Sequence, residues 1–401
     1  MNILMLSSYL PYPLHSGGQV RLYNLIKELS SKHDITLICE IRPHQNDSDI
    51  AAVAKICKKV ITVPRRKQWS IKNIVKSATT AHSFLFTGHL NQEMTQSILE
   101  ATSKESFDLI HVETFYVMQN LPAFTKRIPI VLVEHNIEYK VYEKFRQQAP
   151  LLTRPLFAID IAKIKKEEEY FWKKATRLVA VSEEDKKVME QAGMKPLVVS
   201  NGVNLDEFRP KDIQKSFADS EKKLLFMGDF RWIQNKDSVE FIIKEIWPII
   251  RGKGKGESAN LKLWIVGRNI PESIKQLTND PDIFFDEQSS EKTAPELFHD
   301  AYALLAPIRV GGGTSYKIIE SMACGTPVIT MPLSAMALQA KEGKHLLVGK
   351  TPDELAEKTV QLLTDKKLYE AISKKGREHI EEKYSWKEIG KELEKVYESA
   401  V

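Results

Sequence analysis

Short apolar runs alternate with stretches of helical periodicity along the whole chain. The first run, Asn2–Ser8, is apolar at successive positions, as in a strand buried on both faces of a parallel sheet. Leu22, Leu25 and Leu29 then share one face of a helix, and Asp34–Cys39 is the next run. The alternation continues in the first half with the runs Lys59–Val63, Leu109–Val112, Ile128–Glu134, Arg177–Val181 and Leu197–Ser200. This pattern predicts an α/β fold with a doubly wound parallel sheet.

The second half repeats the same alternation after a turn at Asn201–Phe208 and a charged linker at Lys211–Glu221. A strand at Lys223–Met227 precedes a helical stretch at Asp237–Ile250. The later apolar runs are Leu261–Val266, Ile283–Phe285, Ala301–Ala306, Val328–Met331 and Leu346–Val348. From Pro352 the pattern is helical, with predicted breaks at Asp365-Lys366 and at Gly376, and a last helix follows Tyr384-Ser385-Trp386.

A chain of 401 residues is too long for one ordinary domain. We predict an N-terminal domain over residues 1–203, a C-terminal domain over 204–380 and a final helical segment over 381–401.

A glycine loop, Gly311-Gly312-Gly313, stands between a predicted strand and a predicted helix. Glycines let the backbone approach a ligand closely, and free N–H groups at a helix start suit a phosphate. Thr314 or Ser315 is expected to cap the helix, and Tyr316 and Lys317 follow. Lys317 adds a positive charge, and Glu320, three residues further on, suits ribose hydroxyls. A tight turn beside a solvated Lys–Glu pair is the alternative interpretation.

This segment resembles the donor-binding motif of the family 4 retaining glycosyltransferases. Glu320 matches the second Glu of the Glu-x7-Glu motif, and Ser321–Ile329 matches the run that follows it. Gly312 stands where the first Glu is usual, and Gly311, Gly312, Gly313, Thr314 and Lys317 match a subgroup with Gly-Gly-Gly-Thr-x-x-Lys. The resemblance implies the GT-B fold, in which two Rossmann-like domains face a central cleft, with the last helix crossing back to the first domain.

The resemblance extends to other positions. Gly17 and Gly18 match a glycine pair that lies under the donor's phosphates, and His135 with Asn136 matches a His-Asp/Asn position that reaches the donor sugar. His111, at another strand end, is left between a structural and a substrate-binding role. The family's usual clamp Arg is replaced by Asp229, so Arg231, Lys236 or Lys317 has to supply the charge. Three residues are predicted to be catalytic: His135, Lys317 and Glu320. The predicted substrate-binding residues are Gly17, Gly18, His111, Asn136, Arg231, Lys236, Gly311, Gly312, Gly313, Thr314, Ser315 and Tyr316.

Composition excludes several classes of protein. The chain is 42% hydrophobic and 28% charged, and no apolar run approaches the roughly 20 residues of a membrane span. The start lacks the basic region of a signal peptide. Three cysteines without metal-ligand spacing suit a reducing compartment, and no Asp-x-Asp motif stands in a donor-like loop. We therefore expect a cytoplasmic protein, and the family resemblance implies that it needs no obligatory metal ion or other cofactor.

One basic span stands out. Between Lys55 and Lys76 there are eight basic residues, and no acidic residue occurs from Ile50 to Gln92. Trp69, Ile71, Ile74 and Val75 are interleaved with them. The span is either a solvated basic surface or an amphipathic patch that meets an anionic membrane on its inner face or a lipid-linked acceptor. Nothing resembles a nucleic-acid module, so we expect no nucleic-acid partner.

Together these features predict a glycosyltransferase. A hexose-type sugar would pass from a nucleotide-diphosphate sugar to the hydroxyl of a saccharide or lipid-linked acceptor, with retention, in the synthesis of a cell-surface polysaccharide or glycolipid. Two alternatives stay open. One is a nucleotide-sugar 2-epimerase of the same fold, and the other is a non-catalytic nucleotide-binding subunit, which the absence of Glu at position 312 keeps in view.

Overall fold

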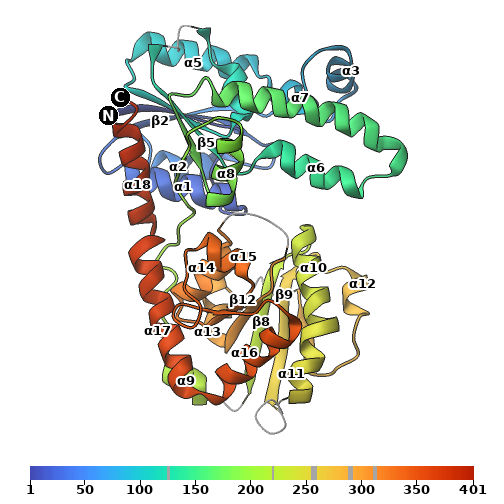
Figure 1. Ribbon diagram of the computed structural model, residues 1–401. Coiled ribbons are helices and arrows are strands. Elements are labelled where there is room, and N and C mark those ends of the chain that lie inside the picture. The colour runs from blue at the N-terminus through green and yellow to red at the C-terminus, as the bar shows by residue number, and fades with distance from the viewer. Residues whose placement is uncertain (124–126, 219–220, 254–259, 288–291, 310–313) are drawn as a thin grey trace. The chain divides into compact units, whose positions relative to one another are not determined.

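The computed structural model describes residues 1–123, 127–218, 221–253, 260–287, 292–309 and 314–401 (Figure 1). The chain forms two compact units. Unit 1 comprises Met1–Ser200 together with Ile389–Val401, and unit 2 comprises Asn201–Glu388. The glycine loop Gly311–Gly313 lies outside the described residues, so its predicted role stays a prediction.

A seven-stranded parallel sheet forms the centre of unit 1, in the order β3-β2-β1-β4-β5-β6-β7. β1 lies in the middle, with Leu4 opposite Thr36 on one side and Ile110 on the other. The strands are β1 (Asn2–Ser7), β2 (Asp34–Ile41), β3 (Lys59–Pro64), β4 (Leu109–Glu113), β5 (Ile130–Glu134), β6 (Arg177–Ala180) and β7 (Leu197–Val198). The direction of growth reverses at β1, and ligands of such sheets bind beyond the carboxyl ends of the strands near that point.

Helices cover both faces of this sheet. Figure 1 shows α5 and α7 on one face and α1 and α2 on the other. One hydrophobic core joins Met94 and Ile98 of α5 to Ile164 of α7 and to Leu4 and Ile110 of the sheet. The α-helices of unit 1 are α1 (Gly17–Leu29), α2 (Asp47–Ala54), α3 (Ile71–Thr79), α4 (Phe84–His89), α5 (Gln92–Lys104), α6 (Glu138–Gln148), α7 (Arg154–Trp172) and α8 (Glu183–Gln191), and the 3-10 helices are η1 (Phe115–Asn120) and η3 (Leu151–Thr153).

The last helix, α18 (Trp386–Glu398), packs its C-terminal part within unit 1. Gly390 allows a close approach to α1, because a Cβ there would lie 3.1 Å from Cβ of Glu28. Glu394 pairs with Lys32 at 2.8 Å and with His33 at 3.2 Å.

Unit 2 is built on a six-stranded parallel sheet in the order β10-β9-β8-β11-β12-β13. Successive residues of β8 alternate between two cores, with Leu224 and Phe226 in one and Leu225 in the other. This is the pattern of a sheet buried on both faces. The strands are β8 (Lys222–Asp229), β9 (Leu261–Arg268), β10 (Ile283–Asp286), β11 (Ala303–Ala306), β12 (Val328–Thr330) and β13 (Leu347–Val348).

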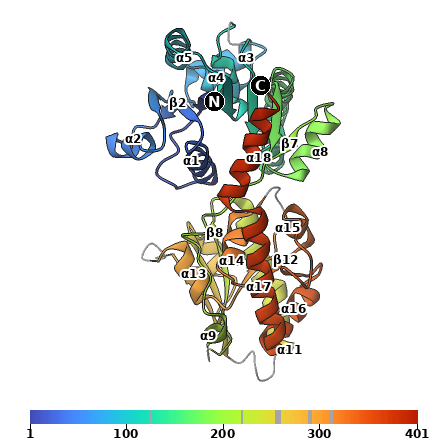
Figure 2. The same ribbon diagram turned by 90° about the vertical axis from the view of Figure 1, so that its left-hand side faces the viewer.

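The helices of unit 2 divide between these two cores. The first core takes apolar side chains from α10, α11 and α16, and the second from α13 and α14. Figure 2 shows α17 beside α14 and α16. The helices are α9 (Ile213–Ala218), α10 (Ile233–Phe241), the π-helical η4 (Ile242–Ile246), α11 (Trp247–Lys253), α12 (Glu272–Lys275), α13 (Ala294–Asp300), α14 (Tyr316–Ala323), α15 (Pro332–Ala337), α16 (Pro352–Thr364) and α17 (Lys366–Lys383).

These two units confirm the predicted fold class, two doubly wound α/β domains. The predicted helix break at Asp365-Lys366 is present, with Asp365 as the N-cap of α17. The predicted break at Gly376 is wrong, because α17 continues through it. Gly376 serves packing instead, since a Cβ there would lie only 2.9 Å from the main-chain oxygen of His345. Among the helices that the structure describes, none combines the length and apolar character that crossing a bilayer requires.

Candidate active site

A cluster of titratable side chains lies at the carboxyl ends of β4 and β5 in unit 1. Glu113, the last residue of β4, is completely buried. One of its carboxylate oxygens accepts a hydrogen bond from Nε2 of His135, which follows β5 directly. The other oxygen lies 2.6 Å from Nε2 of His111. Because a carboxylate only accepts hydrogen bonds, both Nε2 atoms carry the proton that faces Glu113.

Glu113 is ionised despite its burial. Burial acts to raise the pKa of this carboxyl, but the charge of His135 and the hydrogen bonds from both histidines outweigh it and hold the pKa well below its usual value. The guanidinium of Arg21 also lies close, with Nε 3.8 Å from Glu113. Arg21 donates hydrogen bonds to the main-chain oxygens of Ser200 at 2.7 Å and Val199 at 2.9 Å.

The predicted glycine pair meets His135 in this cluster. Gly17 and Gly18 open the 13-residue helix α1, behind the N-cap Ser16. A Cβ on Gly18 would lie 2.9 Å from the hydroxyl of Tyr9 and 3.4 Å from Cε1 of His135. A side chain at position 18 would require Tyr9 to shift, and the positive end of α1 lies beside a histidine whose side chain is 17% exposed. Asn136 is the next residue and is exposed.

His111 has a different position from His135. It is fully buried, and both ring nitrogens have partners, Glu113 at Nε2 and the hydroxyl of Tyr397 at Nδ1, 2.7 Å away. Tyr397 belongs to α18. Burial, with the charge of Glu113, raises the pKa of Tyr397 well above its usual value, so the phenol is neutral. His111 therefore holds Glu113 in place rather than presenting a nitrogen to solvent.

A second cluster lies in unit 2, where β8 and β11 lead into helices. Lys317, the second residue of α14, donates a hydrogen bond to Oδ1 of Asn235 at 2.7 Å, and its ammonium lies 4.2 Å from the ring centroid of Phe226. Asn235 in turn donates to the main-chain oxygen of Asp229 at 2.8 Å. Gly228 makes room for this amide, because a Cβ there would lie 2.6 Å from Nδ2 of Asn235.

Lys317 and Glu320 both have strongly shifted pKa values. Burial lowers the pKa of Lys317 to about 7, against the opposing effect of the Glu320 charge. Burial raises the pKa of Glu320 to about 7, with a further contribution from the charge of Glu207 and an opposing one from Lys317. Shifts of this size toward neutrality are typical of functional sites.

The start of α14 presents an unsatisfied hydroxyl. Ser315 is the N-cap residue, but its side chain makes no capping hydrogen bond. Thr314 is buried, and its hydroxyl has no hydrogen-bond partner within the described parts of the chain. Tyr316 begins the helix. A helix start with a free hydroxyl and a lysine in its first turn is suited to an anion.

The other two candidate cations are placed differently from Lys317. Arg231 is exposed, and its Nε lies 2.9 Å from Oδ2 of Asp229; this partner lowers the pKa of Asp229 to about 2. Lys236, on α10, is partly exposed. Arg309, which the sequence analysis did not single out, pairs with Asp237 at 2.7 Å and covers the ring of Phe241 at 4.0 Å.

Sequence reasoning missed Arg21 and Tyr397 as members of these clusters. Arg21 could have been found, because it is a charged residue next to Leu22 in a helix whose neighbouring positions are apolar. Tyr397 gave no such signal, since its partner is 286 residues away in the sequence.

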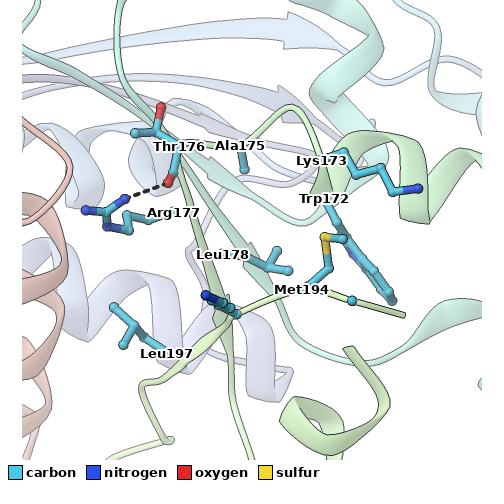
Figure 3. A pocket seen from close by; sticks show the side chains of 10 residues that line it. Trp172, Lys173, Ala175, Thr176, Arg177, Leu178, Met194 and Leu197 are labelled. Carbon is cyan, nitrogen blue, oxygen red and sulfur yellow. Dashed lines mark hydrogen bonds between the residues drawn. The ribbon is translucent and has the colours of Figure 1, made fainter. Parts of the chain in front are cut away.

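A separate hollow of about 490 Å³ lies at the opposite edge of the unit 1 sheet, where β6 and β7 begin. Figure 3 shows Trp172, Met194 and Leu178 around it, with Arg177 hydrogen-bonded to the main-chain oxygen of Thr176. Its position at the amino ends of the strands sets it apart from the cluster around Glu113. Within the described ranges, no group of three or more His, Cys, Asp or Glu side chains is arranged to hold a metal ion.

Two family models match consecutive parts of the chain. The model described as Glycosyltransferase Family 4 matches residues 15–207, and the model described as Glycosyl transferases group 1 matches residues 221–365. The first match contains the cluster around Glu113, and the second contains the cluster around Lys317. Together the two matches span most of the chain and support a relationship to the family 4 glycosyltransferases.

Individual relatives are distant. A phosphatidyl-myo-inositol mannosyltransferase of Mycobacterium leprae is 24% identical over 53% of this chain and 55% of its own length. An uncharacterized glycosyltransferase of Methanocaldococcus jannaschii is 22% identical over 74% of this chain and 76% of its own. The chain spans about half the length of the first curated relatives it matches.

Solved structures share the fold. The sucrose-phosphate synthase of Thermosynechococcus elongatus superimposes with a TM-score of 0.70 over 100% of this chain and 99% of that chain, at 15% identity. Anabaena HepE in complex with UDP and glucose gives a TM-score of 0.65 over 100% of both chains, also at 15% identity. These likenesses confirm the GT-B fold.

Proposed function

We propose that this protein transfers a hexose-type sugar from a nucleotide-diphosphate sugar to an acceptor hydroxyl, with retention of configuration. The observation that carries the proposal is the group at the start of α14, where Lys317, Glu320 and the unpartnered hydroxyl of Thr314 lie together. It offers a cation, an acceptor of ribose hydroxyls and a free donor, which is what a nucleoside diphosphate requires.

Each group has a distinct role in this proposal. The ammonium of Lys317 and the helix N–H groups bind the diphosphate, and the carboxylate of Glu320 accepts hydrogen bonds from the ribose. As the bond between the anomeric carbon and the diphosphate breaks, negative charge grows on the leaving group. Lys317 stabilises that charge, and its amide partner Asn235 fixes the direction of the ammonium. Arg231 is less suited, because it is already paired with Asp229.

His135 acts on the sugar in this proposal. Its ring is held at Nε2 by the ionised Glu113, and its other edge lies beside Gly18 at the start of α1. The neighbouring exposed Asn136 and the glycine pair complete the surface offered to substrate.

The acceptor is proposed to be a saccharide or a lipid-linked sugar, in cell-surface polysaccharide or glycolipid synthesis at the cytoplasmic side of a membrane. Mannosyltransferases named for phosphatidylinositol substrates are among the relatives, one of them GDP-mannose-dependent. The diphosphate charge is met by Lys317 and helix N–H groups, so we propose transfer without an obligatory metal or other cofactor.

A donor screen tests the proposal. UDP-glucose, UDP-N-acetylglucosamine and GDP-mannose are compared by thermal shift, and the donors that bind are assayed for release of nucleoside diphosphate with and without simple sugar acceptors. We expect one donor to stabilise the protein and to be hydrolysed slowly. Conversion of the donor to its epimer without an acceptor would instead support the epimerase alternative. Binding without turnover of any kind would support the non-catalytic one.

A further inference from the structure

Helix α3 exposes the apolar side that an ordinary surface helix buries. Its apolar side faces solvent, with Ile71 82%, Ile74 49% and Val75 53% exposed, and Trp69 just before it is 71% exposed. The residue that it buries is the polar Ser77. A surface helix normally buries its apolar stripe against the core, whereas here Ile71, Ile74 and Val75 face solvent. Trp69 packs against Phe84, with the ring centroids 4.8 Å apart.

Hydrogen bonds to α7 fix this orientation. The hydroxyl of Ser77 donates to Asp160 at 3.1 Å, and the ammonium of Lys163 donates to the main-chain oxygens of Ser77 at 2.6 Å and Thr80 at 2.9 Å. Ser70 caps the helix by accepting from the N–H of Asn73. The apolar side is therefore held outward by specific polar contacts.

Further exposed apolar side chains lie on the α6–α7 hairpin. Leu156 and Ile159 are 70% and 59% exposed, and both lie within about one turn of Asp160, which accepts the hydrogen bond from Ser77 of α3. At the tip of the hairpin Leu151 and Leu152 are 75% and 94% exposed. We call the whole set the apolar face: Trp69, Ile71, Ile74, Val75, Leu151, Leu152, Leu156 and Ile159.

The charges around this face have one sign on the α3 side. Lys67, Lys72 and Lys76 are exposed, and no acidic residue occurs from Ile50 to Gln92. Lys140 and Lys144 are exposed on α6. Two basic residues between Lys55 and Lys76 bind other parts of the protein. Arg65 donates to the main-chain oxygen of Ser8, and Lys58 pairs with Asp34 and Glu105.

We propose that the apolar face inserts into the interfacial layer of an anionic phospholipid bilayer, with Lys67, Lys72 and Lys76 binding lipid headgroups. Apolar side chains next to lysines, with a tryptophan at the boundary, are the composition of an interfacial helix. A second copy of the same chain is a poorer partner, because its own lysines would meet these lysines. The inference does not depend on glycosyl transfer, since no residue of the apolar face is among those assigned to binding or transfer.

Flotation with vesicles tests this proposal. The full-length protein is mixed with vesicles of phosphatidylcholine containing about a third phosphatidylglycerol, or with phosphatidylcholine alone, at about 0.05 M and 0.5 M salt. We expect flotation with the anionic vesicles that weakens as salt rises. The triple variant Lys67→Glu, Lys72→Glu, Lys76→Glu should bind at least about 100-fold more weakly, given the contribution of each lysine near an anionic surface.

Apolar insertion is tested separately. Ile74→Ser with Leu152→Ser removes two exposed side chains, so the fold should be unaffected while vesicle binding falls by about tenfold or more. Met336→Ser, at an exposed position of unit 2, is the matched control and should bind like wild type. Brominated lipids should quench tryptophan fluorescence in the wild type and much less in Trp69→Phe.

Three results would overturn the proposal. They are no binding to anionic vesicles at low salt, equal binding by the wild type and the lysine triple variant, and self-association of the free protein that the Ile74 and Leu152 changes abolish. The last result would make this face a contact between two copies of the chain.

Discussion

The hydroxyl of Tyr397 lies 2.7 Å from Nδ1 of His111 and connects the last helix of the chain to the centre of the unit 1 cluster. Nε2 of His111 lies 2.6 Å from one carboxylate oxygen of Glu113, and the other oxygen accepts a hydrogen bond from His135. Four side chains from β4, β5 and α18 thus form one hydrogen-bonded series that ends at the partly exposed His135. The C-terminal helix therefore helps to build the site.

Tyr397→Phe should destabilise unit 1 by about 1–2 kcal/mol, because Nδ1 of the buried His111 loses its partner. Urea unfolding followed by circular dichroism measures this change in the free energy of unfolding. Tyr170→Phe is the matched control, since the Tyr170 side chain is 55% exposed and should unfold like wild type. Equal stability of the two variants would show that the Tyr397 hydroxyl contributes nothing.

His135→Ala should lower kcat by about 10²-fold, the usual loss when one group that stabilises charge near the reacting centre is removed. Glu113→Gln should lower kcat by at least about tenfold, because the amide lacks the charge that orients His135. Calorimetry should show unchanged nucleoside-diphosphate affinity in both variants, since Lys317 and Glu320 belong to the other unit. Wild-type kcat in a folded Glu113→Gln variant would remove Glu113 and His135 from the mechanism.

Glu320→Ala should weaken nucleotide binding by about 1–3 kcal/mol, the loss expected for hydrogen bonds to a charged group. Isothermal titration with the nucleoside diphosphate of the identified donor measures the change. Glu357→Ala, at an exposed position of α16, is the control and should bind like wild type. If Glu320→Ala binds as tightly as that control, the carboxylate does not contact the ribose.

Affinity for a nucleoside diphosphate should fall as pH rises from 7 to 9. The pKa of Lys317 in the free protein is lowered to about 7, so the side chain loses its charge above that pH, whereas a bound diphosphate favours the charged form and raises the pKa. Binding then takes up a proton, and affinity falls by at most about tenfold per pH unit.

Lys317→Arg keeps its charge over this range, so its affinity should change less with pH. Glu320 is present in both proteins, so the difference between their pH profiles reports on position 317. Titration with UDP or GDP above pH 7 avoids the ionisation of the terminal phosphate, which has a pKa of about 6. A wild-type affinity that is constant from pH 7 to 9 would contradict the lowered pKa of Lys317.

The fold could be predicted from the sequence because each strand is a short apolar run and each helix has its own periodicity. Asn2–Ser7 and Asp34–Ile41 needed no tertiary information. Helix α17 needed tertiary information, because the packing role of Gly376 is visible only next to the main chain of His345. Local propensity predicts a helix break at this glycine, whereas in the structure the helix continues and close packing requires a small residue there.

The proximity of candidate site residues could be predicted where they are close together in the sequence. It could not be predicted where they are far apart in the sequence. Lys317 and Glu320 share one helix, so their proximity follows from spacing. The series from Tyr397 to Glu113 joins segments 286 residues apart. The orientation of α3 could not be predicted either, since its apolar periodicity gives the same pattern whether that side faces the core or solvent.

The most direct test of the central claim is the rate of acceptor-dependent release of nucleoside diphosphate by the wild type and by Lys317→Ala, measured with the donor identified in the screen. The wild type should release nucleoside diphosphate faster when acceptor is present. Lys317→Ala should show weaker donor binding and a kcat lower by about 10²–10³, because the leaving group loses its cation, and Lys317→Arg should restore activity only in part. A kcat for Lys317→Ala within about threefold of wild type, far from that expectation, would contradict the account and move the role to Arg231 or Lys236.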